Sequence, residues 1–189
     1  MWEVFEGRAE RYDDWFERNK TIFERELDCI SKLVPGGFVL EVGVGTGRFA
    51  EKLADLGLDA SPDMLKIAMK RVEVVRGDAH NLPFKNEVFD AVLIIVTICF
   101  LENPKAAIRE AYRVLKRGGA IIIGFIPKDS ALGKIYERKK KMGHAFYSAA
   151  KFFTKAEVEE MLTPFKIEEI RGIKILSEGD FLCIKAVKK

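Results

Sequence analysis

The sequence predicts an α/β protein with a mostly parallel β-sheet, helices on both faces, N-terminal helices and a C-terminal antiparallel hairpin. Residues 38–42 form an apolar run that leads into three glycines and then a helical pattern, as in a strand, a ligand-binding loop and a helix. Residues 88–96 form a near-continuous apolar run, which is typical of a strand buried on both faces. Residues 167–175 and 181–187 alternate around a Ser-Glu-Gly-Asp turn, which predicts the hairpin.

Length and composition indicate a single domain, 1–189. The chain has 189 residues, of which 48% are hydrophobic, enough for one well-filled core. Its net charge of +3 comes from 32 basic and 29 acidic residues, so charge alone does not indicate a nucleic-acid partner. No apolar run reaches the ~18 residues needed to span a bilayer, and the charged N-terminus does not resemble a signal peptide. We therefore expect a cytoplasmic protein without a membrane partner.

Two further features of the composition lead to expectations. Charged residues make up 32% of the chain and glutamine is absent, which is typical of thermophilic proteins. The three cysteines, Cys29, Cys99 and Cys183, are far apart and form no C-x-x-C pair. They predict neither a disulfide framework nor a metal site, and we expect them to be buried apolar side chains.

Helical patterns precede the first strand. Residues 3–18 and 21–33 each carry an apolar stripe at helical spacing, and Pro35-Gly36-Gly37 ends the second pattern. We expect these residues to form an N-terminal helical cap, 1–35. Tyr12 and Trp15 are its most informative side chains, because aromatic rings there are either core residues of the helix or part of a cover over a ligand.

The glycine loop carries a carboxylate that narrows the choice of ligand. Gly43, Gly45 and Gly47 let the chain turn tightly and let a ligand approach the backbone. The dinucleotide pattern G-x-G-x-x-G is not met, because Arg48 occupies its sixth place. Glu41, two residues before the first glycine, would repel a pyrophosphate but suits a cationic ligand. A helix is expected from residue 48 to residue 53.

The elements after the loop follow an α/β order. Residues 56–59 predict the second strand, and Ser61-Pro62-Asp63 starts a helix with an N-cap, a proline at N1 and an acid in the first turn. Residues 72–75 predict the third strand. Asn103-Pro104 starts another helix, expected to end at Gly118-Gly119 before a fifth strand, 120–126. Thr154 and Glu157 form a capping box for the last helix.

Two motifs together resemble those of the class I S-adenosylmethionine-dependent methyltransferases, in particular the small-molecule, methyltransferase type 11-like enzymes. The run from Glu41 to Gly47 matches the acidic-x-G-x-G-x-G motif of that family, and residues 77–84 match its G-D-A-x-x-L-P-F run. The resemblance covers nearly the whole chain. It implies a Rossmann-like seven-stranded sheet and transfer of a methyl group from S-adenosylmethionine to a nucleophilic atom of a small-molecule acceptor (EC 2.1.1.-).

The resemblance also implies site residues. In the family the acid at the Asp78 position accepts a hydrogen bond from the adenine amino group, and the next main-chain N–H, here of Ala79, reaches a ring nitrogen. Asp59 ends the second strand, where a carboxylate can accept both ribose hydroxyl protons. It follows Gly43 by 16 positions rather than the usual ~20, as a short first helix would explain. The expected cofactor-binding residues are Tyr12, Glu41, Gly43, Gly45, Gly47, Asp59, Ala60, Met64, Asp78, Ala79 and Thr97.

Residues 127–153 are the most individual part of the chain and combine a basic run with aromatic side chains. In the family an insertion at this place forms a substrate lid, and the expected acceptor-binding residues are Ile98, Tyr136, Phe146 and Tyr147. No catalytic base and no metal ligand is predicted. The basic run leaves RNA open as a less favoured acceptor, whereas DNA is not expected. An NAD(P)-dependent oxidoreductase and a non-catalytic S-adenosylmethionine-binding protein remain the alternatives; Glu41 and the hairpin oppose the first.

Overall fold

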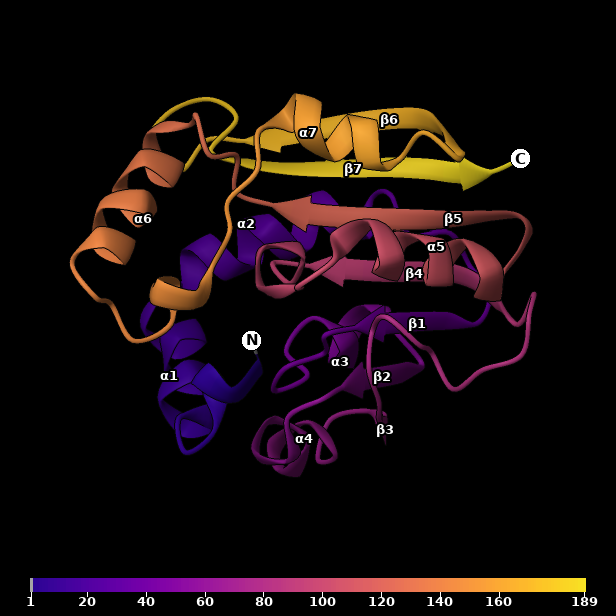
Figure 1. Cartoon of the computed structure of the whole chain (residues 1–189), viewed down its shortest axis with the longest axis horizontal. Helices are drawn as coiled ribbons and strands as arrows, with labels where there is room; N and C mark the ends of the chain where they lie inside the picture. The colour runs from indigo at the N-terminus through magenta and orange to yellow at the C-terminus, as the bar shows by residue number, and fades with distance from the viewer. Residues whose placement is uncertain (1) are drawn as a thin grey trace.

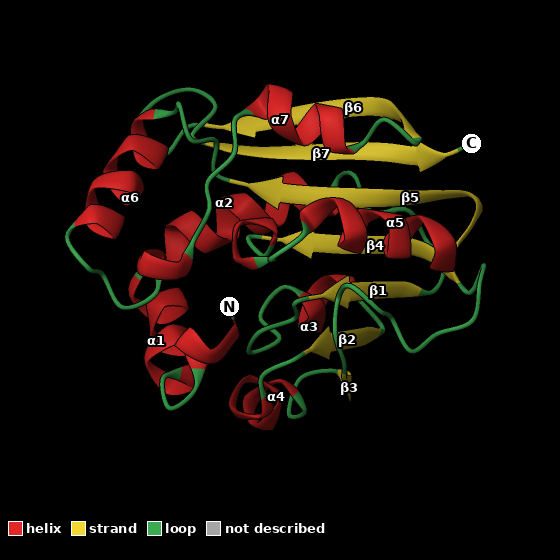
Figure 2. Ribbon diagram, viewed as in Figure 1, coloured by secondary structure: helices red, strands yellow, loops and turns green. Residues whose placement is uncertain are grey.

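The computed structural model describes residues 2–189 and contains a seven-stranded β-sheet (Figures 1 and 2). The strand order is β3-β2-β1-β4-β5-β7-β6. The first five strands in this order run parallel to one another, and β7 runs antiparallel to both β5 and β6. The predicted fold class is confirmed. The strands are β1 (Val39–Val42), β2 (Leu56–Asp59), β3 (Glu73–Arg76), β4 (Phe89–Ile95), β5 (Leu115–Phe125), β6 (Phe165–Ile173) and β7 (Phe181–Lys188).

Three predicted helix starts are confirmed by their capping hydrogen bonds. The side chains of Ser61, Asn103 and Thr154 each accept from a backbone N–H in the first turn of the helix that follows, and Glu157 completes the capping box. The helices are α1 (Ala9–Arg18), α2 (Lys20–Ser31), α3 (Ala50–Leu53), α4 (Pro62–Ala68), α5 (Pro104–Val114), α6 (Ala131–Lys141) and α7 (Lys155–Met161), with 3-10 turns η1 (Trp2–Phe5), η2 (Ile98–Phe100) and η3 (Tyr147–Ala149).

Each face of the sheet is buried under its own helices. On β4, Val92 and Ile94 pack with α5 and α7 in one apolar cluster, whereas Leu93 and Ile95 pack with α2 in another. The alternation follows from the two-residue period of a strand. In Figure 1, α5 and α7 lie in front of the sheet and α2 lies behind it. The doubly covered β4 is the reason that its sequence is apolar at nearly every position.

Two predicted helix boundaries are wrong at glycines. The expected helix 3–18 is divided into η1 and α1, because Gly7 has φ +67° and ends the first turn. The expected break at Gly118-Gly119 instead lies inside β5, which begins at Leu115. Its pairing with β4 is irregular between Phe89 and Ala91, so the two glycines accommodate a bulge rather than a helix end. The helix after the glycine loop is also shorter than expected, since α3 begins at Ala50.

The cysteines are all buried and unbridged, as expected, but two of them meet. The Cys183 thiol on β7 donates to the Cys29 sulfur on α2, with the sulfur atoms 3.1 Å apart. This hydrogen bond raises the pKa of Cys183 and lowers that of Cys29. Within residues 2–189, no group of three or more His, Cys, Asp or Glu side chains is arranged to hold a metal ion. Nor is any helix in this range long and apolar enough to cross a membrane.

Candidate functional site

The carboxyl ends of β1 and β4 mark the point where the strand order reverses, which is where open α/β sheets bind their ligands. Gly43 follows β1 and Thr97 follows β4. The Thr97 hydroxyl lies 3.0 Å from the Gly43 carbonyl oxygen, to which it donates, and so joins the two strand ends. Figure 1 shows α1 and α6 beyond this edge of the sheet, on the left. The site is therefore enclosed by the N-terminal segment and by the segment between β5 and α7.

A cavity of about 500 Å³, here called the loop cavity, opens beside the glycine loop. Nine of the predicted cofactor residues line it, whereas Glu41 and Gly47 do not. Aromatic residues of the N-terminal segment, Trp2 and Phe5, were missed by the sequence analysis and also form part of its wall. The predicted residues in the wall are Tyr12, Gly43, Gly45, Asp59, Ala60, Met64, Asp78, Ala79 and Thr97.

Asp59 connects the second strand to the glycine loop. Its Oδ2 accepts from the Gly45 N–H at 2.8 Å, and its Oδ1 accepts from the Ser61 N–H at 2.9 Å. Burial raises the pKa of this carboxyl above its usual value, although the backbone N–H groups oppose the shift. Each carboxylate oxygen still has capacity for another donor. Although Asp59 follows Gly43 by fewer residues than usual, its side chain still lies in the cavity wall beside the loop.

Asp78 is oriented by a neighbouring histidine, His80. The Asp78 carboxylate accepts from the His80 backbone N–H at 2.9 Å and lies 2.6 Å from His80 Nδ1. His80 Nε2 accepts from the Asn103 N–H at 3.2 Å, so Nδ1 carries the proton and donates to Asp78. These hydrogen bonds lower the pKa of Asp78. The carboxylate is thus held ionised at the cavity wall.

Ion pairs hold the N-terminal segment over the loop. Asp13 on α1 accepts from Arg48, at 2.8 Å to Nε, and from Arg71, at 2.9 Å to Nη1. Arg71 also donates to the Thr46 carbonyl oxygen, inside the loop. Burial opposes ionisation of Asp13, but the two guanidinium groups outweigh it and hold its pKa well below the usual range. Asp63 adds a further attachment, because its Oδ2 accepts from the Gly7 N–H at 2.8 Å.

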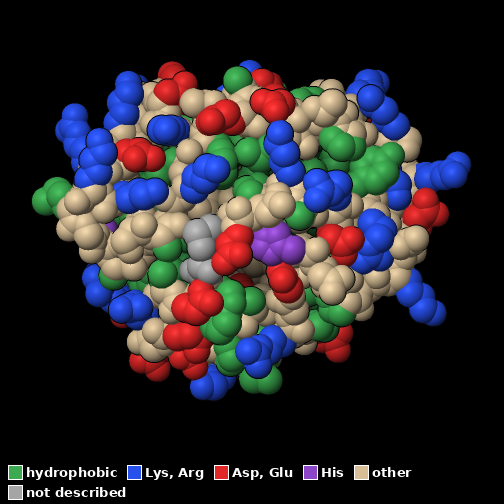
Figure 3. Space-filling view, in the orientation of Figure 1, with side chains coloured by type: hydrophobic (Ala, Val, Ile, Leu, Met, Phe, Trp, Pro, Cys, Tyr) green, Lys and Arg blue, Asp and Glu red, His purple; other side chains and the backbone are tan. Residues whose placement is uncertain are grey.

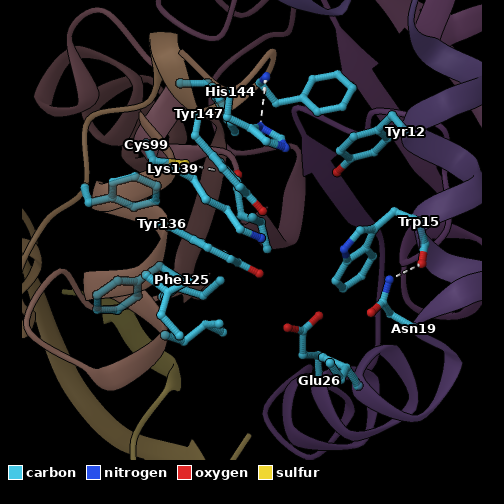
Figure 4. A pocket seen from close by; sticks show the side chains of 18 of the residues that line it. Tyr12, Trp15, Asn19, Glu26, Cys99, Phe125, Tyr136, Lys139, His144 and Tyr147 are labelled. Carbon is cyan, nitrogen blue, oxygen red and sulfur yellow. Dashed lines mark hydrogen bonds between the residues drawn. The ribbon is translucent and has the colours of Figure 1, made fainter. Parts of the chain in front are cut away.

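A second cavity, of about 540 Å³ and here called the aromatic cavity, lies between α1, α2 and α6 (Figure 4). All four predicted acceptor residues, Ile98, Tyr136, Phe146 and Tyr147, line it. The two cavities adjoin, because residues of η1, α1 and the end of β4 form part of both walls. These shared residues are Phe5, Tyr12, Val96 and Phe100.

Residues 127–153 close the aromatic cavity through ring contacts. Tyr136 of α6 stacks on Tyr147 of η3 with ring centroids 4.3 Å apart. Phe146 stacks on Phe5 at 5.6 Å and meets the edge of Tyr12 at 6.0 Å, so this segment rests on the N-terminal segment. Figure 3 shows lysine and arginine side chains gathered over α6, on its outer side. Most of the basic run thus lies outside the aromatic cavity, but Lys139 faces it, with its ammonium 5.5 Å from the centre of the Tyr136 ring.

Two titratable groups in the aromatic cavity have altered acidities. Burial raises the pKa of the Cys99 thiol to about 12, so it stays protonated near neutral pH. Burial also raises the pKa of Glu26, on α2, to about 8. Glu26 was missed by the sequence analysis. The sequence did contain a signal for its burial, because Glu26 lies three residues after Phe23 and four before Ile30, on the apolar side of its helix.

Comparisons with known proteins agree with this geometry. Residues 40–123 match the model of a methyltransferase domain family. The chain is 43% identical to an uncharacterized protein of Methanocaldococcus jannaschii over 98% of both chains. It is 33% identical to a demethylmenaquinone methyltransferase of Thermotoga maritima, covering 97% of this chain and 92% of that one. A crystal structure from Thermotoga maritima, described as a SAM-dependent methyltransferase and possible histamine N-methyltransferase, superposes with a TM-score of 0.92 at 37% identity over 100% of both chains.

The chain belongs to the class I S-adenosylmethionine-dependent methyltransferases. The oxidoreductase that the sequence left open is a different family, and the match over the full length disfavours it.

The loop cavity of this methyltransferase fits the cofactor that the family implies. A Cβ at Gly45 would meet nothing closer than the Tyr12 ring, at 3.5 Å, so the bare loop leaves room for a ligand next to Tyr12. Asp59 and Asp78 place carboxylates in the cavity wall, and carboxylates accept hydrogen bonds from hydroxyl and amino groups such as those of adenosine. Glu41 lies outside the wall, and among residues 2–189 its Oε2 has no hydrogen-bond partner although the residue is only 2% exposed. Burial and the charge of Asp59 raise its pKa well above the usual value.

Gly47 also lies outside the wall of the methyltransferase's loop cavity, and its surroundings indicate a packing role. Its φ is +84°, and a Cβ there would lie 3.2 Å from the Ala68 Cα of α4. The third glycine of the motif therefore allows α4 to approach the loop.

Proposed function

We propose that this methyltransferase transfers a methyl group from S-adenosylmethionine to a small-molecule acceptor bound in the aromatic cavity. The observation that carries the proposal is the shared wall, because a ligand in the loop cavity and one in the aromatic cavity would meet beside Tyr12 and Val96. The bound cofactor supplies an electrophilic methyl group on its sulfonium. The protein's contribution is alignment of the two ligands, which can be worth several kcal/mol.

The residues near the shared wall support alignment rather than base catalysis. Cys99 stays protonated, as described above. Burial is the main cause that raises the pKa of the Tyr12 phenol above its usual value, and the charges of Glu41 and Asp59 add to the shift. The phenol therefore does not ionise near neutral pH. Neither group is therefore available as an anionic base at the shared wall. Their role in the proposed reaction is to exclude water and to shape the passage between the cavities.

The relatives carry names that refer to two different acceptors. One structure is described as a possible histamine N-methyltransferase, and one curated relative is a demethylmenaquinone methyltransferase. An aromatic cavity of about 540 Å³ suits the ring of either kind of molecule. It favours a small acceptor over RNA, because the cavity is lined mainly by aromatic and apolar side chains and, of the five basic residues on α6, Lys139 alone lines it.

Thermal unfolding tests the choice of cofactor. We expect S-adenosylmethionine and its demethylated product to raise the melting temperature, because Asp59, Asp78 and the open glycine loop suit an adenosine with a cationic tail. At a hundredfold excess over Kd the stabilisation should be about 2.7 kcal/mol. NAD and NADP serve as controls and should leave the melting temperature unchanged. A larger shift with NAD than with S-adenosylmethionine would refute the cofactor proposal.

The variant Tyr136→Ala tests whether residues 127–153 form a substrate lid. Tyr136 lines the aromatic cavity but not the loop cavity, so its removal should raise the KM for the acceptor about tenfold and leave the Kd for the cofactor unchanged. Tyr112→Ala on α5 is the matched control, since Tyr112 packs on Phe165 away from both cavities. Steady-state rates and calorimetric cofactor titration measure the two effects. A loss of cofactor affinity with normal acceptor KM would show that residues 127–153 are not a substrate lid.

Methyl transfer from labelled S-adenosylmethionine separates the enzyme from a protein that only binds the cofactor. A pooled extract of small metabolites is the acceptor source, and a labelled product that requires the protein is the expected result. Tight cofactor binding without any labelled product would favour the non-catalytic alternative.

A further inference from the structure

An unpaired carboxylate faces the aromatic cavity. Glu26 is 3% exposed, yet within residues 2–189 its side chain takes part in neither a hydrogen bond nor an ion pair. Figure 4 shows its carboxyl group directed into the open space between Trp15 and Tyr136. These two rings come from α1 and α6, on opposite sides of the cavity. Glu26 therefore places an acidic group in a wall that is rich in aromatic side chains.

The ionised form of Glu26 is costly in this position unless something binds it, and for this reason burial raises its pKa to about 8 in the free protein. Removing a charged group from water costs several kcal/mol unless a partner compensates for the lost hydration. The Lys and Arg side chains that line the cavity have other contacts. The Lys139 ammonium lies 5.5 Å from the centre of the Tyr136 ring, Arg11 lies over the Phe146 ring, and Arg18 donates to the Asp14 carbonyl oxygen. The titratable and charged groups around the cavity are Arg11, Tyr12, Arg18, Cys29, Cys99, Tyr136, Lys139, His144 and Tyr147.

We propose that Glu26 binds the ammonium group of a cationic acceptor, so that the methyl acceptor of this enzyme is an amine with an apolar or aromatic body. The inference rests on the proposed function, in that it places the acceptor in the aromatic cavity. An ammonium group supplies the donors and the charge that the carboxylate lacks. For methyl transfer the ammonium would give one proton to the Glu26 carboxylate, which leaves the nitrogen with a lone pair. The neutral nitrogen would then form a bond to the sulfonium methyl as the methyl–sulfur bond breaks and S-adenosylhomocysteine leaves. The faces of Trp15 and Tyr136 add cation–π attraction on either side.

The same residues disfavour the other classes of acceptor. A neutral quinol would fill the aromatic cavity but would supply no positive charge to stabilise the ionised form of Glu26. An acidic acceptor would place a second negative charge beside the first. Among small molecules that carry a ring, an amine is the class that satisfies both the rings and the carboxylate.

Binding of phenethylamine, 2-phenylethanol and 3-phenylpropionate tests this inference without turnover. The three probes share a ring and a two-carbon chain and differ in charge. Isothermal titration calorimetry of each probe into the protein saturated with S-adenosylhomocysteine would measure its Kd. The amine should bind about ten- to a hundredfold more tightly than the alcohol, as expected for a hydrogen bond between charged groups, and the acid should bind more weakly still.

Glu26→Gln removes the charge at nearly constant volume and should abolish the preference for the amine. Glu24→Gln is the matched control, because Glu24 lies on the same helix with its side chain 58% exposed, and it should behave as the wild type. Equal binding of the amine and the alcohol to the wild type, no binding of the amine, or a preference that persists in Glu26→Gln would each overturn the inference. If the cofactor still raises the melting temperature in that case, the proposed function stands and the assignment of an amine alone fails.

The pH dependence of the free protein is an independent readout. With a pKa of about 8 in the folded state and ~4.3 in the unfolded chain, Glu26 binds more protons when folded between these values. The melting temperature should therefore fall as pH rises from about 5 to 8. The melting temperature of Glu26→Gln should fall less over this pH range, and saturating phenethylamine should offset the fall in the wild type. A decline of equal size in Glu26→Gln would show that Glu26 is not the unpaired group.

Discussion

Asp59→Ala is expected to weaken S-adenosylmethionine binding by about thirty- to a thousandfold. If the carboxylate accepts two hydroxyl hydrogen bonds from the ribose, its removal costs roughly 2 to 4 kcal/mol of binding free energy. The loss should appear as affinity rather than as a slower saturated rate, because ribose contacts are similar in the ground state and the transition state. Calorimetric titration of the cofactor and initial rates at saturating cofactor measure the two quantities.

The variant also removes two contacts inside the protein, so its controls must separate binding from folding. Asp59 accepts from the backbone N–H groups of Gly45 and Ser61, and its loss should lower the melting temperature of the free protein as well. Asp59→Asn should have a milder effect on Kd, because the amide oxygen can still accept. Asp129→Ala is the matched control, since Asp129 is exposed and lines neither cavity. An unchanged Kd in Asp59→Ala would mean that the ribose contact lies elsewhere.

Gly43→Ala is expected to have the largest effect on stability, about 2 to 6 kcal/mol of unfolding free energy. Gly43 has φ +74°, which costs an alanine about 1 to 3 kcal/mol. A Cβ there would also lie 2.2 Å from the Thr97 Cγ2 and 2.5 Å from its Oγ1, so the ends of β1 and β4 would have to separate. The change would break the contact that joins the two strand ends in the wall of the loop cavity. Chemical denaturation of the free protein measures it.

Gly118→Ala isolates the backbone contribution. Gly118 has nearly the same φ, +73°, but a Cβ there would meet nothing within 4 Å. The free energy of unfolding of Gly118→Ala should therefore fall only by the cost of the left-handed backbone. The difference between the two variants then gives the cost of the clash with Thr97. Equal losses in both variants would show that the loop moves away from Thr97 without penalty, and that the strand ends are not rigidly joined.

Local patterns in the sequence were sufficient for the fold class and for most of the loop-cavity wall. The glycine loop, the caps at Ser61, Asn103 and Thr154 and the apolar run of β4 depend on neighbours within a few residues, so their structure can be predicted from spacing alone. Parallel strands bring their carboxyl ends to one edge, and for this reason Asp59 and residues around Asp78 could be expected in one site. The helix boundaries at Gly7 and at Gly118 failed because glycine serves equally in turns, bulges and helix ends.

The tertiary structure alone decided which residues from distant segments share a cavity. Glu26 is on the apolar side of α2 by its spacing, but only the placement of α1 and α6 shows that no partner reaches it and that aromatic rings surround it. The shared wall of the two cavities likewise depends on contacts between η1 and residues beyond β4. Hydrogen-bond partners and burial are properties of contacts between remote residues, and a single sequence does not encode them by spacing. For this reason the sequence indicated the cofactor, and the structure was needed to infer the acceptor.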